Sequence, residues 1–212
     1  MKKILIFASN GFESLELSPF IDVFGWNNIV GTKKVFPTIC AIHDVLSATW
    51  NLKIIPEVNL LKTSINLNEF HALIIPGGFG KAGFFNDIQS ETLNSLLNHF
   101  ISNKKTIIGI CTGALAIGIH GYLKNIPATT YLLDNERYFK QLEQYNAIPI
   151  KKDIVISDNI ITSSGPGTAI DLAFYLLEKL TDQENCMVVK KNMNFLNNLR
   201  FLMKFLVFYV ML

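Results

Sequence analysis

The sequence is poor in cysteine, histidine and charge. Only three cysteines occur among 212 residues: Cys40, Cys111 and Cys186. An odd count without metal-type spacing argues against a disulfide framework and against a zinc site. Charged residues make up 17% of the chain, and the formal net charge of +2 is too small to indicate a nucleic-acid partner. We therefore expect reduced thiols, no metal ion and no nucleic-acid binding.

The sequence also has no long hydrophobic run near its start and no acidic residue in its last 28 positions, 185–212. The first apolar run, residues 4–8, is too short for the core of a signal peptide, so we expect a cytoplasmic protein. Residues 185–212 contain four basic residues and no acid, which leaves the remainder of the chain near −2. Residues 192–212 are largely apolar, but Arg200 and Lys204 interrupt them, and a membrane span needs about 20 apolar residues.

The chain divides into a body, residues 1–185, and a C-terminal apolar and basic extension, residues 186–212, which is not a separate domain. We expect residues 192–212 of the extension to dock on the body or on a second subunit, because this much exposed apolar surface would otherwise promote association. A basic interfacial helix in contact with a membrane and a poorly ordered segment are the alternatives.

Within the body, solid apolar runs alternate with segments of helical periodicity. The apolar runs predict buried strands, and apolar residues spaced three and four apart predict helices. Expected strands cover residues 3–8, 35–42, 71–80 (running into a glycine loop), 106–110 and two short segments within 153–165; expected helices cover 13–24, 91–105, 113–120 and 167–180. Residues 53–58 fit a hairpin or an edge strand. This alternation predicts an α/β sandwich with a parallel sheet covered on both faces.

One cysteine lies between a predicted strand and a predicted helix. The pentapeptide Gly109-Ile110-Cys111-Thr112-Gly113 has the Gly-x-Cys-x-Gly pattern of a nucleophile elbow. Glycines two residues away on each side let strand and helix approach closely, and the helix N-terminus favours a thiolate. The backbone N–H of Thr112 would be one oxyanion donor. A small buried cysteine in a tight turn is the alternative.

Two further features accompany this cysteine at strand ends. Pro76-Gly77-Gly78 ends another apolar strand, and glycines there expose N–H groups at the same sheet edge. In "GFESLEL", Glu13 fits a carboxylate that favours a helix N-terminus, whereas Glu16 lies among leucines and could be buried and protonated.

The motifs "GFESLE", "IIPGGFG", "GICTGA", "KNIPATTY" and "SSGPGTAIDLAFYLLEKL", in this order, resemble the ThiJ/PfpI superfamily and its parkinsonism-associated deglycase-like branch. The resemblance implies a flavodoxin-like three-layer sandwich with a mostly parallel sheet, similar to class I glutamine amidotransferases, and a homodimer. It also implies that Cys111 is the nucleophile, that Glu16 hydrogen-bonds to it, and that the backbone N–H groups of Gly78 and Thr112 form the oxyanion site.

The sequence departs from the family pattern at two positions. Protease members carry histidine directly after the cysteine, where this chain has Thr112, so we do not expect a peptidase. The deglycase-like branch often has histidine where this chain has Tyr131, which could donate a hydrogen bond to a substrate but is a poor base. His120 lies about half a helical turn out of phase with Cys111 and is interpreted as a packed or interface histidine.

These residues predict a cysteine-dependent enzyme of the glyoxalase or deglycase type, acting on small reactive carbonyls without a cofactor. Cys111 would add to an aldehyde such as that of methylglyoxal, and protonated Glu16 would shuttle a proton. An isonitrile hydratase-like lyase is the second enzyme hypothesis, because Cys-Thr-Gly also resembles those enzymes. The third is a non-enzymatic cysteine-oxidation sensor or chaperone, which would use a low-pKa accessible cysteine.

Overall fold

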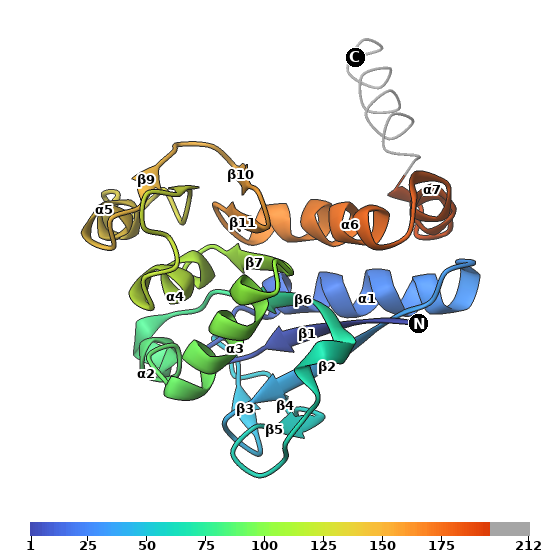
Figure 1. Ribbon diagram of the computed structural model, residues 1–212, viewed down its shortest axis with the longest axis horizontal. Helices are drawn as coiled ribbons and strands as arrows, with labels where there is room; N and C mark the ends of the chain where they lie inside the picture. The colour runs from blue at the N-terminus through green and yellow to red at the C-terminus, as the bar shows by residue number, and fades with distance from the viewer. Residues whose placement is uncertain (196–212) are drawn as a thin grey trace, which may run out of the picture.

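The computed structural model describes residues 1–195 as a three-layer α/β sandwich around one seven-stranded sheet (Figure 1). The sheet order is β10-β11-β7-β6-β1-β2-β5, and every neighbouring pair is parallel except the antiparallel pair β10–β11. Its strands are β1 (Lys2–Phe7), β2 (Val35–Ala41), β5 (Val58–Asn59), β6 (Phe70–Ile75), β7 (Thr106–Ile110), β10 (Ile154–Ser157) and β11 (Ile160–Ser163). The predicted mostly parallel sheet is confirmed.

Helices cover both faces of this sheet. On one face, α1 (Ser14–Val30) and α6 (Ala169–Leu180) lie side by side, and α7 (Gln183–Asn192) packs against both. The other face carries α2 (Phe84–Asp87), α3 (Glu91–Ser102) and α4 (Gly113–Ile119), and α5 (Arg137–Gln144) packs against α4. Short pieces complete the chain: β3 (Leu46–Ser47), β4 (Lys53–Ile54), β8 (Pro127–Ala128), β9 (Ile148–Pro149), and the 3₁₀ turns η1 (Leu67–Glu69), η2 (Gly80–Ala82) and η3 (Pro166–Thr168).

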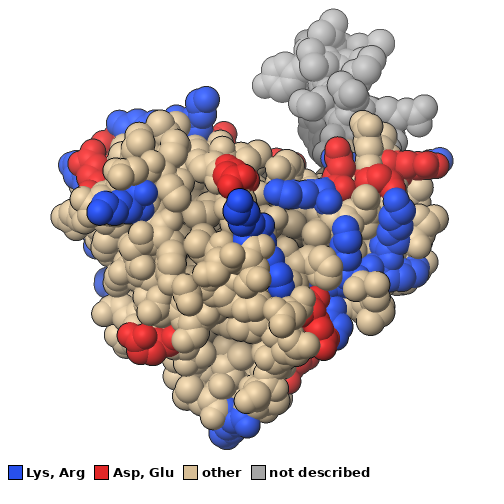
Figure 2. All heavy atoms as spheres, in the orientation of Figure 1, with Lys and Arg blue, Asp and Glu red and all other residues tan. Residues whose placement is uncertain are grey.

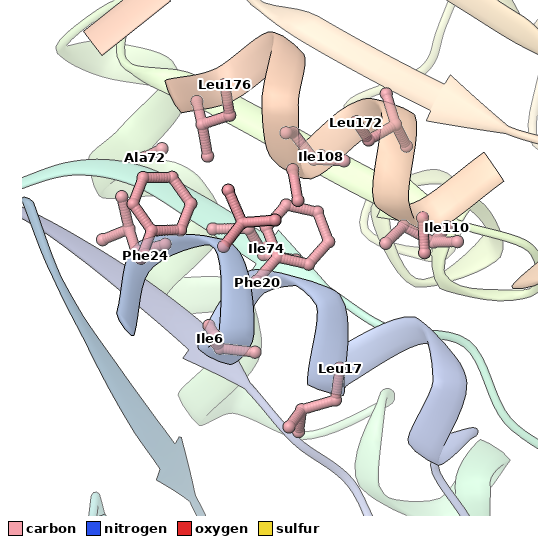
Figure 3. Packing of buried hydrophobic residues seen from close by; sticks show 14 of the residues in the cluster. Ile6, Leu17, Phe20, Phe24, Ala72, Ile74, Ile108, Ile110, Leu172 and Leu176 are labelled. Carbon is pink, nitrogen blue, oxygen red and sulfur yellow. The ribbon is translucent and has the colours of Figure 1, made fainter. Parts of the chain in front are cut away.

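Alternate residues of the central strands fill two separate cores. In β1, Ile4 and Ile6 face the core under α1 and α6, whereas Leu5 and Phe7 face the core under α2, α3 and α4. This is the period-two alternation of a strand, and both faces are apolar because both are covered. Figure 3 shows the first core, where Phe20 and Phe24 of α1 pack among strand and α6 side chains.

The parallel strands β11, β7, β6, β1, β2 and β5 all begin at one end of the sheet and finish at the opposite end. At the beginning of β1, the Lys2 ammonium donates a hydrogen bond to the carbonyl of Leu180 at 2.5 Å, at the C-terminus of α6. Such an ammonium satisfies a carbonyl that the helix leaves unpaired. Strands β1, β6 and β7 finish at the opposite end of the sheet, and the loops that follow them meet there. In open α/β sheets, ligands bind at these carboxyl ends of the strands.

The expected elements appear with shifted ends and several additions. A hairpin and an edge strand were the two structures predicted for residues 53–58, and both occur. Strand β4 forms a hairpin with β3, and β5 is the edge strand of the main sheet. Helix α1 runs six residues beyond the predicted end at residue 24 and continues through Pro19. Helices α2, α5 and α7 and strands β8 and β9 were not predicted; of these, α2, β8 and β9 are only two to four residues long, too short to show a periodicity.

Helix α7 spans the predicted boundary at residue 185. Cys186 and Val189 are buried against α1 and α6, so the chain up to Phe195 continues the body. The predicted docking of the extension concerns mainly residues 196–212, which lie outside the described residues. Among residues 1–195, no helix is long and apolar enough to cross a membrane.

Charged side chains of both signs are interspersed on the face drawn in Figure 2, and a wide area between them is uncharged.

Candidate active site

The segments that follow β1, β6 and β7 meet at one edge of the sheet and bring the predicted residues together. Cys111 directly follows β7, Gly77 and Gly78 follow β6, and Glu16 lies in the first turn of α1 after β1. Cys111, Glu16, Gly78, Thr112 and Tyr131 all line one cavity. The ordered sequence motifs therefore converge in space.

The backbone at Cys111 has the strained turn that the pentapeptide predicted. Its φ is +53°, in the left-handed region that residues with a side chain rarely adopt. Two hydrogen bonds hold the turn: the Cys111 N–H donates to Ser163 O at 2.8 Å, and Thr130 Oγ1 donates to Cys111 O at 2.7 Å. A Cβ on Gly113 would lie 2.1 Å from Ile75 O, so only glycine permits this approach of helix to strand. Maintaining such a strained residue is typical of functional sites.

The Glu16 side chain is fully buried beside the cysteine. Its Oε2 accepts a hydrogen bond from the Gly77 N–H at 2.6 Å, while Oε1 is buried without a hydrogen-bond partner among the described residues. Burial raises the pKa of this carboxyl to about 8; the Gly77 N–H and the Cys111 thiol act in the opposite direction, and the charge of Glu13 raises the pKa further. A carboxyl with this pKa is mainly protonated at neutral pH.

Glu13 occupies a different position, at the N-cap of α1. Its side chain accepts a hydrogen bond from the Leu15 N–H at 3.5 Å. This agrees with its interpretation as a carboxylate that favours the helix N-terminus. Glu13 also lines the cavity and is 7% exposed, so it contributes charge to the site.

The electrostatic environment of Cys111 differs from the predicted one. We expected the N-terminus of α4 to favour a thiolate, but burial raises the pKa of the Cys111 thiol, and Glu16 raises it further once its own carboxyl is ionised. The Thr112 N–H and hydroxyl act in the opposite direction without cancelling the effect of burial. Desolvation outweighs the dipole here because the side chain is mostly buried and α4 has only seven residues.

Thr112 and Gly78 are joined by a reciprocal pair of hydrogen bonds. The Gly78 N–H donates to Thr112 Oγ1 at 2.8 Å, and Thr112 Oγ1 donates to Gly78 O at 2.9 Å. The Gly78 N–H, which the family resemblance assigned to the oxyanion site, is thus already used inside the protein. The Thr112 N–H, by contrast, interacts with the Cys111 sulfur.

The cavity above Cys111 has a volume of about 1050 Å³. Tyr131, the predicted residue on the substrate side, lines it and meets the Tyr138 ring edge-on, with centroids 6.3 Å apart. None of the described residues that line the cavity is a histidine, and His120 instead contacts Ile88 O at 2.8 Å. Among residues 1–195, no group of three or more His, Cys, Asp or Glu side chains could hold a metal ion.

Part of the cavity wall was not predicted from the sequence. Phe85 comes from α2, and Arg137 and Tyr138 from the start of α5. The Arg137 guanidinium lies 4.4 Å from the Tyr138 ring centroid and forms an ion pair with Asp134 at 2.8 Å. The apolar spacing of Tyr138, Phe139 and Leu142, all buried, is the signal that could have located this helix.

Comparison with known proteins agrees with this geometry. Residues 2–179 match the model of the DJ-1/PfpI family. The crystal structure of Drosophila melanogaster DJ-1beta has the same fold, with a TM-score of 0.76 and 24% identity over 91% of this chain and 97% of that one.

Three curated relatives extend the comparison. The chain is 26% identical to Protein DJ-1 homolog B of Arabidopsis thaliana over 190 residues, 89% of this chain and 40% of that protein. It is 29% identical to the glutathione-independent glyoxalase DJR-1.2 of Caenorhabditis elegans over 135 residues, 62% of this chain and 66% of that protein. It is 28% identical to the isonitrile hydratase of Pseudomonas putida over 123 residues, 58% of this chain and 51% of that protein.

The family match covers nearly the whole body, and the fold and the convergence of its motifs agree with it. The chain therefore belongs to the DJ-1/PfpI family, and the DJ-1 homologues place it in the DJ-1-like branch.

Proposed function

We propose that the protein is a cysteine-dependent enzyme that converts small 2-oxoaldehydes such as methylglyoxal into 2-hydroxy acids. The observation that carries the proposal is a partly exposed Cys111 beside a buried, protonated Glu16 whose Oε1 has no other hydrogen-bond partner among the described residues. This reaction needs a nucleophilic thiol and one neighbouring group that gives and accepts a proton. The similarity to a glyoxalase of Caenorhabditis elegans supports the same reaction class.

The reaction begins when Cys111 Sγ adds to the aldehyde carbon. The thiol proton ends on the carbonyl oxygen, through the Glu16 carboxyl, and a hemithioacetal forms. Glu16 gives a proton and accepts one back in this step, so it finishes protonated. Because burial raises the thiol pKa, transfer of the proton during attack avoids a free thiolate in the resting enzyme. The Thr112 N–H holds the oxygen.

The same carboxyl then moves a proton between the two carbons. Glu16 gives its proton to the oxygen of the second carbon as it takes the proton from the first carbon, which forms an enediol. It then delivers this proton to the second carbon and takes the hydroxyl proton of the first carbon in exchange, which leaves a thioester of the 2-hydroxy acid on Cys111 and a protonated Glu16. Water cleaves the thioester, releases lactate and restores the thiol. The net change is addition of one water molecule, so no external oxidant or reductant is needed.

Two alternatives use the same residues. The similarity to an isonitrile hydratase favours that reaction, but the Thr112 hydroxyl already donates to Gly78 O and accepts from Gly78 N–H. An oxidation sensor needs thiolate character, and burial raises the pKa of Cys111 instead. We therefore rank both below the carbonyl reaction. Deglycase activity, a homodimer and a cytoplasmic location stay predictions.

The test is formation of lactate from methylglyoxal by the purified protein and two variants. We expect Cys111→Ser and Glu16→Gln to reduce kcat/KM by at least about 100-fold, because each removes a group that changes its bonding in the reaction.

Two control variants accompany them. Cys186→Ser keeps a donor for Phe174 O, to which Cys186 Sγ donates at 3.4 Å, and Glu143→Gln changes an exposed residue of α5. Both should retain activity. If the unmodified protein forms no more lactate than Cys111→Ser, the proposed function is wrong.

A further inference from the structure

The cavity is much larger than methylglyoxal requires. Its volume of about 1050 Å³ is just above the range of roughly 300–1,000 Å³ that is typical of sites for drug-sized ligands. A three-carbon substrate on Cys111 would leave most of this space filled with water. The remaining space therefore suits a substituent on the carbonyl compound.

One side of the cavity is a continuous wall of aromatic rings. The rings of Phe85 and Tyr138 are stacked, with an interplanar angle of 18° and centroids 6.1 Å apart. The Tyr131 ring contacts the Tyr138 ring edge-on, with centroids 6.3 Å apart, and extends the aromatic wall toward the residues around Cys111. These rings come from three separate segments: α2, the loop after β8, and α5. Flat rings at these separations favour an aromatic group packed against them.

A second aromatic pair also lines the cavity. The ring centroids of Trp50 and Phe79 are 5.8 Å apart, and the two residues are 69% and 48% exposed. A ligand that covered this apolar surface as well would gain binding free energy for an apolar substituent.

The charged residues near the aromatic wall favour a neutral substituent on the substrate over an anionic one. The Arg137 guanidinium is held by Asp134 at 2.8 Å, and it also donates to the Tyr138 hydroxyl at 2.6 Å. The cation at the wall is therefore already paired with a carboxylate. Lys81 lines the cavity as well, but it is exposed.

We propose that the preferred substrates are 2-oxoaldehydes with an aromatic substituent, such as phenylglyoxal, whose ring packs on the wall formed by Phe85, Tyr131 and Tyr138. The inference rests on the proposed function and names its substrate class. The chemistry is unchanged: Cys111 adds to the aldehyde carbon, the proton moves between the carbons, and water releases mandelate. The ring takes no part in bond making and contributes only binding.

The test compares kcat/KM for phenylglyoxal and methylglyoxal in the full chain. Product acid, mandelate or lactate, is measured instead of loss of the dicarbonyl, because arylglyoxals also react with arginine side chains. Cys111→Ser supplies the background. We expect phenylglyoxal to be favoured by about tenfold or more, the effect of burying an aromatic ring.

Two variants assign the preference to the wall. Tyr138→Leu should lower the ratio of kcat/KM for phenylglyoxal to kcat/KM for methylglyoxal several-fold. Tyr175→Leu changes a tyrosine on α6 that does not line the cavity, and it should change neither value. Circular dichroism and thermal unfolding establish that both variants are folded.

The possible outcomes separate the two proposals. Equal rates for the two substrates, or a preference for methylglyoxal, would overturn the inference and leave the proposed function standing. A preference that Tyr138→Leu does not reduce would overturn the assignment to this wall. Absence of turnover with both substrates would overturn the proposed function and the inference with it.

Discussion

Glu16 has two consequences at the scale of a single residue, one for chemistry and one for stability. Its carboxyl has a pKa near 4.5 in the unfolded chain and about 8 in the folded protein, chiefly because it is buried. Between these pH values the folded protein binds one more proton than the unfolded chain. The free energy of unfolding therefore decreases as pH rises from about 4.5 to about 8, by roughly 1.4 kcal/mol per pH unit for this group.

We predict that Glu16→Gln removes this pH dependence. Glutamine keeps an oxygen for the Gly77 N–H and has no proton to lose. At pH 9 the variant should be more stable than the unmodified protein by on the order of 2–4 kcal/mol, with a much smaller difference at pH 5. Urea unfolding at the two pH values measures this. The exposed Glu143→Gln should show no such change, and a constant difference between pH 5 and pH 9 for Glu16→Gln would contradict the burial argument.

The element that determines the position of Cys111 is the turn between β7 and α4. Here the close approach of helix to strand depends on Gly113, whose added Cβ would lie 2.1 Å from Ile75 O and 3.1 Å from the carbonyl carbons of Ile75 and Pro76. Backbone atoms cannot move away as the end of a flexible side chain can. The turn therefore tolerates no side chain at this position.

Replacement of two glycines by alanine tests this. Gly113→Ala should destabilise the protein by several kcal/mol and reduce lactate formation, because α4 must shift away from β6. Gly25→Ala, inside α1, has nothing within 4 Å of the new methyl group and should stabilise by about 0.5–1 kcal/mol. Thermal unfolding of both variants gives the comparison. A Gly113→Ala protein as stable as Gly25→Ala would mean that the turn is not constrained.

The sequence was informative about elements with strong patterns and uninformative about contacts that depend on side-chain conformation. Apolar runs located β1, β2, β6 and β7, and motif order identified Cys111 and Glu16. No periodicity indicates that the Thr112 hydroxyl would engage the Gly78 N–H. Likewise, the loop before α5 has three consecutive residues with positive φ, at positions 134–136, that are not glycine. Tertiary packing determines the backbone path of this loop, and the position of the aromatic wall depends on that path.

At the scale of the whole molecule, the buried amide of Asn185 joins α7 to the end of α1 and the loop that follows it. Asn185 in α7 accepts hydrogen bonds from the Thr32 N–H at 2.7 Å and the Lys33 N–H at 3.3 Å, and its own amide donates to Asn27 Oδ1 at 2.7 Å. Asn27 and Asn185 are both buried. Buried polar groups of this kind are costly to leave without partners.

We predict that Asn185→Ala destabilises the whole protein. The change leaves the N–H groups of residues 32 and 33 and the Asn27 Oδ1 atom without these partners, which should cost about 2–4 kcal/mol. Asn192→Ala is the matched control, since its side chain only donates to Val188 O and is exposed. Urea unfolding should give a single cooperative transition for each variant. Local loosening of α7 without loss of global stability would contradict this role.

The parallel sheet also determines where the protein can be attached to a label or a solid surface. Lys2 begins β1 at one edge, and Glu16, Gly78 and Cys111 gather at the other, one strand length of about 20 Å away. Met1 is 86% exposed, so a tag, a biotin or a surface linkage can be joined there. Such an attachment leaves the cavity mouth open, and immobilised protein can be tested directly with dicarbonyls in flow.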